Sequence, residues 1–458
     1  MSRYKAYPEY KDSGLACFGR IPPHWVISKL RYKFAFGKGL TITKENLVDD
    51  GIPCVNYGEV HSKFGFEVNP TKHSLKCVDE SYLKAFSNSL LSKGDFVFAD
   101  TSEDLDGSGN FTQLTSDTAT FAGYHTIIAR PEGHKNTRYL AYLFDAKEFR
   151  TQIRLAVKGV KVFSITQAIL RGADIWLPSD DEQKNIAAFL DHETAKIDAL
   201  IEKQQRLIEL LKEKRQAVIS HAVTKGLNPN VPMKDSGVAW LGEVPAHWSL
   251  KNYRYATQIY RGKFGHRPRN DPAFYDGIYP FIQTGDVAQA GKRILDYKQT
   301  LNERGKAVSQ KFPAETLVMA IAANIGDTAI LDFEAYAPDS IVGFKPYQDL
   351  DLEFLRYSLM AALPALEQTS TQSTQANLNI DRIGSVQAAF PLLEEQLEIV
   401  VYLDHLIDRY AEIEEKALTA IERMQERRTA LISAAVTGKI DVRDWQAAAS
   451  QAVVGVEC

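Results

Sequence analysis

Two long stretches of the chain carry apolar residues at heptad-like spacing, with polar and charged residues between them. No proline or glycine interrupts the first stretch between Ser179 and Gly226. Stripes of this kind predict α-helices, and helices this narrowly striped pack against each other as coiled coils. About 45 residues at ~1.5 Å each give a rod of roughly 65 Å. The predicted core positions are Leu190, Ile197, Ile201, Ile208, Leu211 and Val218 in the first helix and Leu403, Tyr410, Ile421, Met424 and Leu431 in the second.

The first predicted helix has start and stop signals. Ser179 and Glu182 have the spacing of a capping box, in which the serine caps the third amide and the glutamate reaches back. Gly226, followed by Pro229, predicts the C-terminal end. Because both helices belong to one chain, we expect them to pair intramolecularly and antiparallel, with one mixed domain at each end of a rigid spacer.

Outside the helices the apolar pattern changes to short strand-like runs. In the first half these include 96–98 and 126–128, interrupted by a loop-like segment at 104–110. In the second half the runs 316–321 and 329–331 occupy similar positions. Short β-rich runs with turn residues between them predict mixed domains of strands and loops.

The chain also repeats itself in the same order. The segment 11–25, with its Asp-Ser-Gly and Pro-x-His-Trp motifs, returns as 234–248. The segment 178–224, which opens Pro-x-x-x-Glu-Gln, returns as 391–437. A repeat this long is far beyond the period of solenoid proteins and indicates a duplicated unit of domain plus helix.

The repeat extends into the mixed regions, because the segments Gly51 to Val60 and Gly277 to Val287 are similar in sequence. We therefore predict an α+β protein with two similar mixed α/β domains, separated by two long helices that form an antiparallel coiled coil with a pseudo-two-fold internal repeat. The predicted parts are domain 1 at 1–178, a central helical spacer at 179–228, domain 2 at 229–390, a distal helical spacer at 391–444 and a tail at 445–458.

Composition narrows the class of protein. The chain has 458 residues, 45% of them hydrophobic and 24% charged, which is ordinary for a soluble globular protein. Its four cysteines show no metal-ligand spacing, so we expect free thiols and a cytoplasmic location. We see no signal peptide and no membrane span. The net charge of −4 means that a DNA-binding role would need locally concentrated cations.

Several strings resemble enzyme motifs without matching them. The run Gly285 to Arg293 resembles a phosphate loop but is one residue too long and lacks the final Ser/Thr. Asp271 to Phe274 resembles an amino-methyltransferase loop without its second proline. Glu182 to Lys184 lies at a helix start, and the recurrent His192 and His405 are each a lone histidine on a helix. We predict no catalytic site and no metal site.

Local positive charge with aromatic and amide neighbours points instead to nucleic acid. The segment 261–270 holds four cations and a histidine without an acid, which suits phosphate contacts and arginine readout of guanine. A solvated surface loop is the alternative for this segment. The amide-rich segment 370–379 could read adenine edges, and its counterpart 158–161 is basic. The candidate DNA-binding residues are Lys38, Lys44, Asn56, Tyr57, Lys158, Lys161, Arg261, Lys263, His266, Arg267, Arg269, Asn270, Gln283, Lys292, Arg293, Gln372 and Gln375.

Two variable domains, each followed by a long helix that opens Pro-x-x-x-Glu-Gln, resemble the DNA specificity (S) subunits of type I restriction–modification systems. The Asp-Ser-Gly and Pro-x-His-Trp openings, and the Thr-Gln-x-Asn-Leu-Asn approach to the second helix, strengthen the likeness. The resemblance implies two target recognition domains that each read half of a bipartite DNA target. It also implies that the coiled coil sets the spacer between the half-sites.

The resemblance further implies double-stranded DNA and two modification subunits as partners, with restriction subunits as a further component. S-adenosylmethionine, ATP and Mg would then belong to those partners, and this chain would hold no cofactor and no catalytic site. The alternative from a different class is a non-DNA coiled-coil scaffold that dimerises partner proteins.

Overall fold

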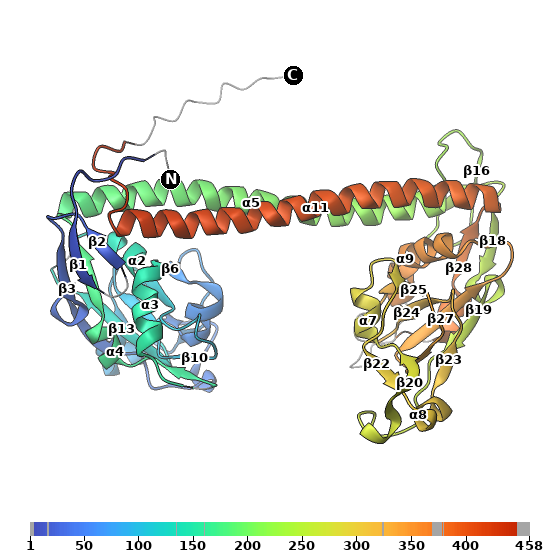
Figure 1. Ribbon diagram of the computed structural model, residues 1–458, viewed down its shortest axis with the longest axis horizontal. Coiled ribbons are helices and arrows are strands. Elements are labelled where there is room, and N and C mark those ends of the chain that lie inside the picture. Colours follow the sequence, from blue (N-terminus) through green and yellow to red (C-terminus); the bar gives the residue numbers. More distant parts are fainter. Residues whose placement is uncertain are drawn as a thin grey trace. The chain divides into compact units, whose positions relative to one another are not determined.

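The computed structural model describes residues 4–15, 18–133, 135–159, 161–322, 325–368, 378 and 380–446. The chain forms two compact units. Unit 1 contains Met1–Gln204 and Thr419–Cys458, and unit 2 contains Gln205–Leu418. Each unit therefore combines one mixed domain with part of both long helices (Figure 1). The units differ from the predicted parts, which follow one another along the sequence. Each long helix is divided between the two units, because each of its segments packs against a different domain.

The two predicted helices are α5 (Asp180–Lys225) and α11 (Leu393–Val436). Ser179 Oγ accepts from the Glu182 amide at 3.4 Å, as a capping box requires. The reciprocal half of that prediction is wrong, because the Glu182 carboxylate accepts instead from side chains of the domain opening. The glycines after the helices adopt φ values of 75° at Gly226 and 71° at Gly438, a left-handed conformation that suits a C-terminal cap.

Within each unit the two helices pair in opposite directions. In unit 1 the start of α5 packs with the end of α11, where Arg428 Nε donates to Asp198 at 3.0 Å. In unit 2 the end of α5 lies beside the first half of α11, where Lys212 is 3.9 Å from Glu414. The predicted core positions are all buried or half-buried, and five are buried: Leu190, Ile197, Leu403, Ile421 and Leu431.

Domain 1 contains two sheets. The order of the five-stranded sheet is β4 (Phe34–Lys38), β13 (Thr126–Pro131), β9 (Phe96–Ala99), β11 (Phe111–Leu114) and β6 (Phe66–Val68). The order of the four-stranded sheet is β7 (Cys77–Val78), β5 (Ile52–Val55), β12 (Thr120–Ala122) and β8 (Leu90–Leu91).

Domain 2 repeats this topology strand for strand. Its five-stranded sheet has the order β19 (Thr257–Arg261), β27 (Ile341–Pro346), β24 (Leu317–Ala320), β25 (Thr328–Leu331) and β21 (Arg293–Ile294). Its four-stranded sheet has the order β22 (Gln299–Leu301), β20 (Tyr275–Phe281), β26 (Ala335–Ala337) and β23 (Gln310–Phe312). The parallel pairs fall at the same positions in both domains, so the predicted duplication of the mixed domain is confirmed.

A strand near the start of each domain pairs with the strand that leads into the long helix. In domain 1, β3 (Val26–Lys29) pairs with β15 (Asp174–Leu177), directly before α5. In domain 2, β18 (Ser249–Asn252) pairs with β28 (Gln387–Phe390), directly before α11. The openings form the hairpins β1 (Lys11–Leu15) with β2 (Phe18–Ile21) and β16 (Met233–Asp235) with β17 (Glu243–Pro245).

Short helices cover the sheets and carry aromatic side chains into the two main cores. The helices of domain 1 are α1 (Tyr82–Ala85), α2 (Thr137–Asp145), α3 (Lys147–Ala156) and α4 (Gln167–Gly172). Those of domain 2 are α6 (Tyr253–Ala256), α7 (Thr284–Gln289), α8 (Glu303–Val308), α9 (Leu352–Gln368) and α10 (Ile380–Ser385). Cys54 and Cys77 are free thiols, as predicted, whereas Cys17 and Cys458 lie outside the described residues.

Candidate nucleic-acid interface and its supporting frame

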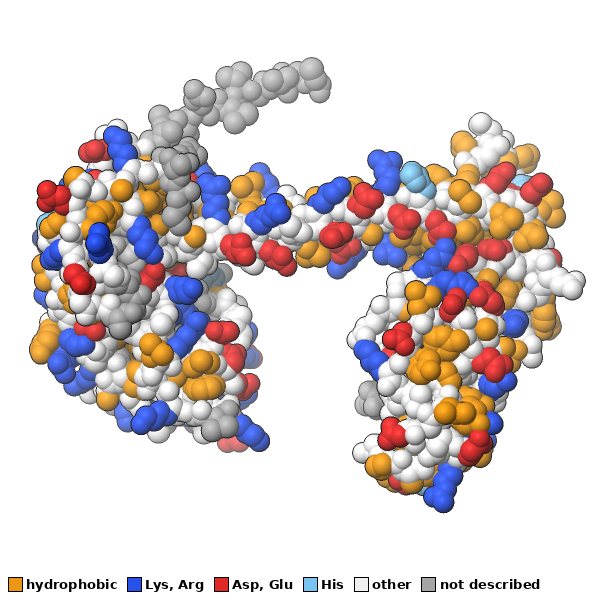
Figure 2. All heavy atoms as spheres, in the orientation of Figure 1, with side chains coloured by type: hydrophobic (Ala, Val, Ile, Leu, Met, Phe, Trp, Pro, Cys, Tyr) orange, Lys and Arg blue, Asp and Glu red, His pale blue; other side chains and the backbone are white. Residues whose placement is uncertain are grey.

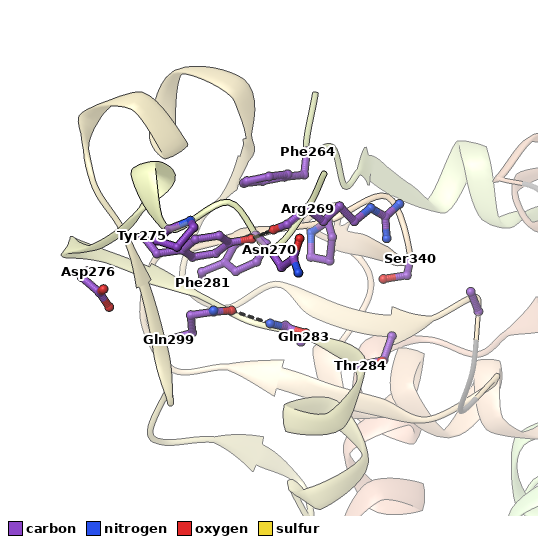
Figure 3. Close-up of a pocket in the computed structure, with 13 residues that line it drawn as sticks. Phe264, Arg269, Asn270, Tyr275, Asp276, Phe281, Gln283, Thr284, Gln299 and Ser340 are labelled. Carbon is purple, nitrogen blue, oxygen red and sulfur yellow. Dashed lines mark hydrogen bonds between the residues drawn. The ribbon is translucent and has the colours of Figure 1, made fainter. Parts of the chain in front are cut away.

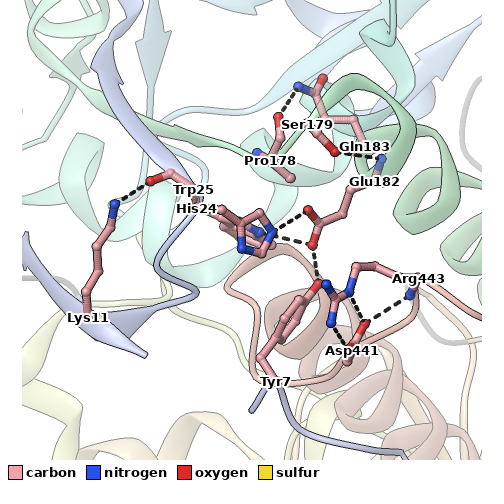
Figure 4. Close-up of polar contacts among 10 residues, drawn as sticks. All are labelled: Tyr7, Lys11, His24, Trp25, Pro178, Ser179, Glu182, Gln183, Asp441 and Arg443. Carbon is pink, nitrogen blue, oxygen red and sulfur yellow. Dashed lines mark hydrogen bonds and ion pairs between the residues drawn. The ribbon is translucent and has the colours of Figure 1, made fainter. Parts of the chain in front are cut away.

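A carboxylate joins each domain opening to its long helix. In unit 1, Glu182 accepts from Trp25 Nε1 at 3.1 Å and lies 2.8 Å from His24 Nε2 (Figure 4). Tyr7 donates its hydroxyl to the same carboxylate, and burial together with this contact raises the pKa of Tyr7. The recurrent His-Trp and Glu-Gln motifs are therefore the two halves of one contact.

Unit 2 repeats this contact. Glu395 accepts from Trp248 Nε1 at 3.0 Å and lies 2.9 Å from His247 Nε2. The following glutamines act alike as well, since Gln183 and Gln396 each donate to the carbonyl of their own helix-leading proline at 2.9 Å. We call the residues His24, Trp25, Glu182 and Gln183, with their equivalents His247, Trp248, Glu395 and Gln396, the frame.

The recurrent Leu-Asp-His motif has a related role, carried by its aspartate. Asp191 accepts from the Tyr142 hydroxyl at 2.7 Å and from Arg138 Nε at 2.7 Å. In unit 2, Asp404 accepts from the Tyr357 hydroxyl at 2.6 Å and from Lys292 Nζ at 2.7 Å. Each aspartate thus fixes its helix to the neighbouring domain.

An open cleft of about 630 Å³ lies in domain 2 (Figure 3). Three aromatic rings form one side, with the centroid of Phe264 5.8 Å from that of Tyr275 and 5.5 Å from that of Phe281. Most of the other lining residues are polar, and three of them are predicted DNA-binding residues: the neighbours Arg269 and Asn270, and Gln283. Gln299, which lies opposite Phe281 in the strand register, also lines the cleft and was not among the predicted residues.

The cationic loop of domain 2 is partly held by contacts of its own arginines. Arg267 Nη1 donates to the Phe264 carbonyl at 2.7 Å, and Arg267 Nη2 lies 3.3 Å from Asp339. Arg269 forms an ion pair with the same aspartate. His266 stacks on Phe274 with ring centroids 4.0 Å apart. These side chains shape the loop, and their DNA contacts stay predictions.

Two of the predicted DNA-binding cations of domain 2 remain available. Arg261 and Lys263 are exposed, and neither forms an ion pair with any residue in the described part of the chain. Arg261 ends β19, and Lys38 ends the equivalent strand β4 of domain 1, where it is also exposed. Lys44, Lys158 and Lys161 of domain 1 are exposed as well.

The other predicted residues of domain 2 lie elsewhere. Lys292, in addition to its bond to Asp404, lies 3.3 Å from Glu353, so its present contacts support the domain. Arg293 forms ion pairs with Glu315 and with Asp332, the latter at 3.2 Å. Gln372 and Gln375 lie outside the described residues.

The same position in domain 1 carries a different surface. Asn56 and Tyr57 precede Gly58-Glu59 as Gln283 and Thr284 precede Gly285-Asp286. The Asn56 amide is 1% exposed and donates to the Cys54 carbonyl at 3.4 Å. Tyr57 instead packs against His61, with centroids 4.5 Å apart, a histidine that no sequence signal marked. Domain 1 presents aromatic rings where domain 2 presents amides.

These features define a protein with two related domains that share the same frame contacts and carry unlike surfaces. The sequence model of the type I restriction modification DNA specificity domain matches residues 22–210 and 264–423, and the chain belongs to this family. Specificity subunits of type I systems recognise DNA sequence and are not themselves catalytic, so the expectations on family, fold and lack of enzyme activity are confirmed.

The chain is also similar to individual proteins. The chain is 25% identical over 433 residues to a Methanocaldococcus jannaschii protein named as the specificity subunit of type I restriction enzyme MjaX, covering 93% of this chain and 96% of the relative. A chain from a structural study of complex assembly and conformational transition in a type I restriction–modification system superposes with a TM-score of 0.68 at 15% identity, covering 92% of this chain and 99% of that one. The HsdS subunit from Thermoanaerobacter tengcongensis gives 0.48 at 15% identity, with 92% and 98% covered.

The described residues contain no cluster of histidine, cysteine, aspartate or glutamate that could hold a metal ion. None of the described helices combines the length and the apolar character that crossing a membrane requires.

Proposed function

We propose that each mixed domain reads one half of a bipartite DNA target and that the paired helices set the spacer between the halves. The observation that carries this proposal is the contrast between the two copies. Their strand order and frame contacts are the same, but the surfaces after β5 and β20 differ in chemistry. A shared scaffold with unlike polar surfaces is what recognition of two unlike half-sites requires.

The exposed cations give each domain a means of holding the DNA backbone. Lys38 and Arg261 occupy equivalent strand ends, and Lys263 follows two residues later in domain 2. Lysine and arginine at such positions contact phosphates, which orients a domain on the duplex without reading sequence. Base readout then falls to the side chains between them.

The long helices supply the surface on which two modification subunits would dock. In unit 2, Leu393, Leu397 and Val401 recur every four residues on α11 and are 44%, 47% and 69% exposed. Figure 2 shows apolar side chains exposed over this end of the helices, beside charged ones. An exposed apolar stripe on a helix marks an interaction surface. S-adenosylmethionine, ATP and Mg would bind to the modification and restriction subunits.

The exposure of an aromatic ring next to this stripe also differs between the two units. Tyr402 is 45% exposed in unit 2. Its equivalent in unit 1, Phe189, is fully buried under Tyr4 and Trp445, with ring centroids 5.3 and 5.5 Å away. Residues near the two ends of the chain thus cover the Phe189 ring in unit 1, whereas the equivalent Tyr402 ring in unit 2 stays open to a partner.

Single-molecule sequencing of DNA from cells that express this chain with its cognate modification subunit tests the proposal. The expected result is methyladenine in a bipartite motif with an unspecified spacer. A continuous motif, or methylation without sequence preference, would contradict it. Binding to duplex DNA should also weaken steeply with salt, whereas a non-DNA scaffold would show no such dependence.

A further inference from the structure

The cleft of domain 2 contains two glutamines whose amides are joined. Gln283 Nε2 donates to Gln299 Oε1, and the two side chains point toward each other in Figure 3. The strand register explains the pairing. Gln299 on β22 lies opposite Phe281 on β20, and Gln283 follows two residues after Phe281 on the same side.

The bond between the glutamines leaves a defined set of polar groups for a ligand. The Gln283 side chain keeps one N–H and one lone pair of its carbonyl oxygen, because that oxygen also accepts from the Asp286 amide in the capping box of α7, and the Gln299 side chain keeps both N–H groups. Since each amide fixes the orientation of the other, the site offers an acceptor and a donor side by side. A ligand that matches it must present one donor and one acceptor at the same spacing.

We propose that this pair of glutamines reads an adenine in the major groove, and so one A·T base pair of the half-site of domain 2. Adenine presents the N6 amino donor beside the N7 acceptor, and glutamine is a natural bidentate partner for these two atoms. The half-buried ring of Tyr275, which packs beside the buried Phe281, provides an apolar surface for the thymine methyl group. This inference rests on the proposed function and specifies one position within it.

The groups around the pair favour an adenine edge over phosphate or guanine. Guanine presents two acceptors and is read mainly by arginine or lysine. The one arginine that lines the cleft, Arg269, is engaged with Asp339. Asp276 lines the cleft and is exposed, which disfavours a phosphate there. The site has amide donors and acceptors but no unpaired cation among its described lining residues.

Domain 1 has no equivalent reader. Asn56 occupies the position of Gln283, but its amide is buried against the Cys54 carbonyl. The effect of the glutamine pair is therefore confined to one half of the target. This asymmetry separates a loss of base readout from a general loss of DNA binding.

The test maps methylation by Gln283→Ala, Gln299→Ala and, as a control, Gln310→Ala, each in complex with the modification subunit. Gln310 is exposed on β23 and its side chain bonds to the Lys311 carbonyl, outside the cleft. We expect both cleft variants to relax the same A·T position of one half-site by roughly 5- to 150-fold, with the other half-site and the control unchanged. Unchanged preference in both cleft variants, or relaxation at a G·C position, would overturn the inference.

A second measurement begins with the wild-type complex. Duplexes carrying 7-deazaadenine, which lacks the N7 acceptor, at each adenine of the half-sites in turn should bind more weakly at one position only. A Gln283→Ala complex should show no further loss there. Equal binding of every substituted duplex would reject the adenine contact. If the wild type shows no bipartite motif at all, the proposed function itself fails.

Discussion

Single buried residues explain why certain short motifs appear twice in this chain. Glu182 collects hydrogen bonds from Tyr7 and Trp25 and lies against His24, all from the opening of its domain. A buried charged group of this kind is stable only while its partners remain, and the partners are equally dependent on it. The His-Trp motif at the opening of a domain and the Glu-Gln motif at the start of its long helix therefore depend on each other.

Replacing Glu182 by alanine should cost more than replacing Glu395. The Glu182 side chain is 3% exposed and that of Glu395 is 29% exposed, so the first substitution leaves buried donors without water to replace the carboxylate. We expect a loss of about 3 kcal/mol for Glu182→Ala and about 1 kcal/mol for Glu395→Ala. Hydrogen exchange of β3 and β18 measures each loss locally. Equal losses would contradict this role of burial.

Replacing Lys263 by alanine tests the phosphate role of the exposed cations. One lost phosphate contact should weaken binding equally for all sequences and reduce the salt slope by about 1. Lys311→Ala is the matched control, because Lys311 is paired with Glu334 at 2.8 Å. Filter binding over a range of salt concentrations provides the slope. A change in base preference instead would assign Lys263 to readout.

At the scale of secondary structure, the helices and the repeat could be predicted and the side-chain partners could not. The heptad pattern predicted α5 and α11 because burial of a narrow stripe is a local periodic property. The Gln283–Gln299 bond depends on which strands become neighbours, and Arg269 meets an aspartate seventy residues later in the sequence. No local spacing records such contacts. The basic loop was therefore recognised, while its internal ion pairs were not.

Introducing charge into the apolar stripe of α11 should impair partner binding without unfolding the chain. Leu397→Glu with Val401→Glu alters only exposed positions, so stability should change by less than about 1 kcal/mol. Native mass spectrometry of the complex should show one modification subunit where the wild type holds two. The control changes the equivalent positions of α5, Lys184 and Ala188, both exposed, to glutamate. Full occupancy in the α11 variant would place the docking surface elsewhere.

At the scale of the whole molecule, the repeated parts of the chain form the scaffold, and the parts that differ carry the recognition surfaces that we propose. Strand order, frame contacts and helix ends are duplicated, and they hold two domains on one pair of helices. The surfaces that differ, around Tyr57 in domain 1 and around Gln283 in domain 2, carry the unlike recognition chemistry that we propose.

Lengthening a helix should change the spacer alone. Four residues inserted between Lys203 and Gln204 add about one turn, or ~6 Å, to α5. We expect methylation mapping to show both half-sites unchanged and the spacer longer. An unchanged spacer in a folded, active complex would reject the role of the helices as a ruler.

Exchanging one domain for a second copy of the other tests the central claim most directly. Residues 234–391 would replace residues 11–178, with both junctions at equivalent positions of the repeat. Methylation mapping of this chain, in complex with the modification subunit, should give a bipartite motif whose two halves are the half-site of domain 2 in inverted orientation. Retention of the original asymmetric motif by a folded, active complex would contradict the account.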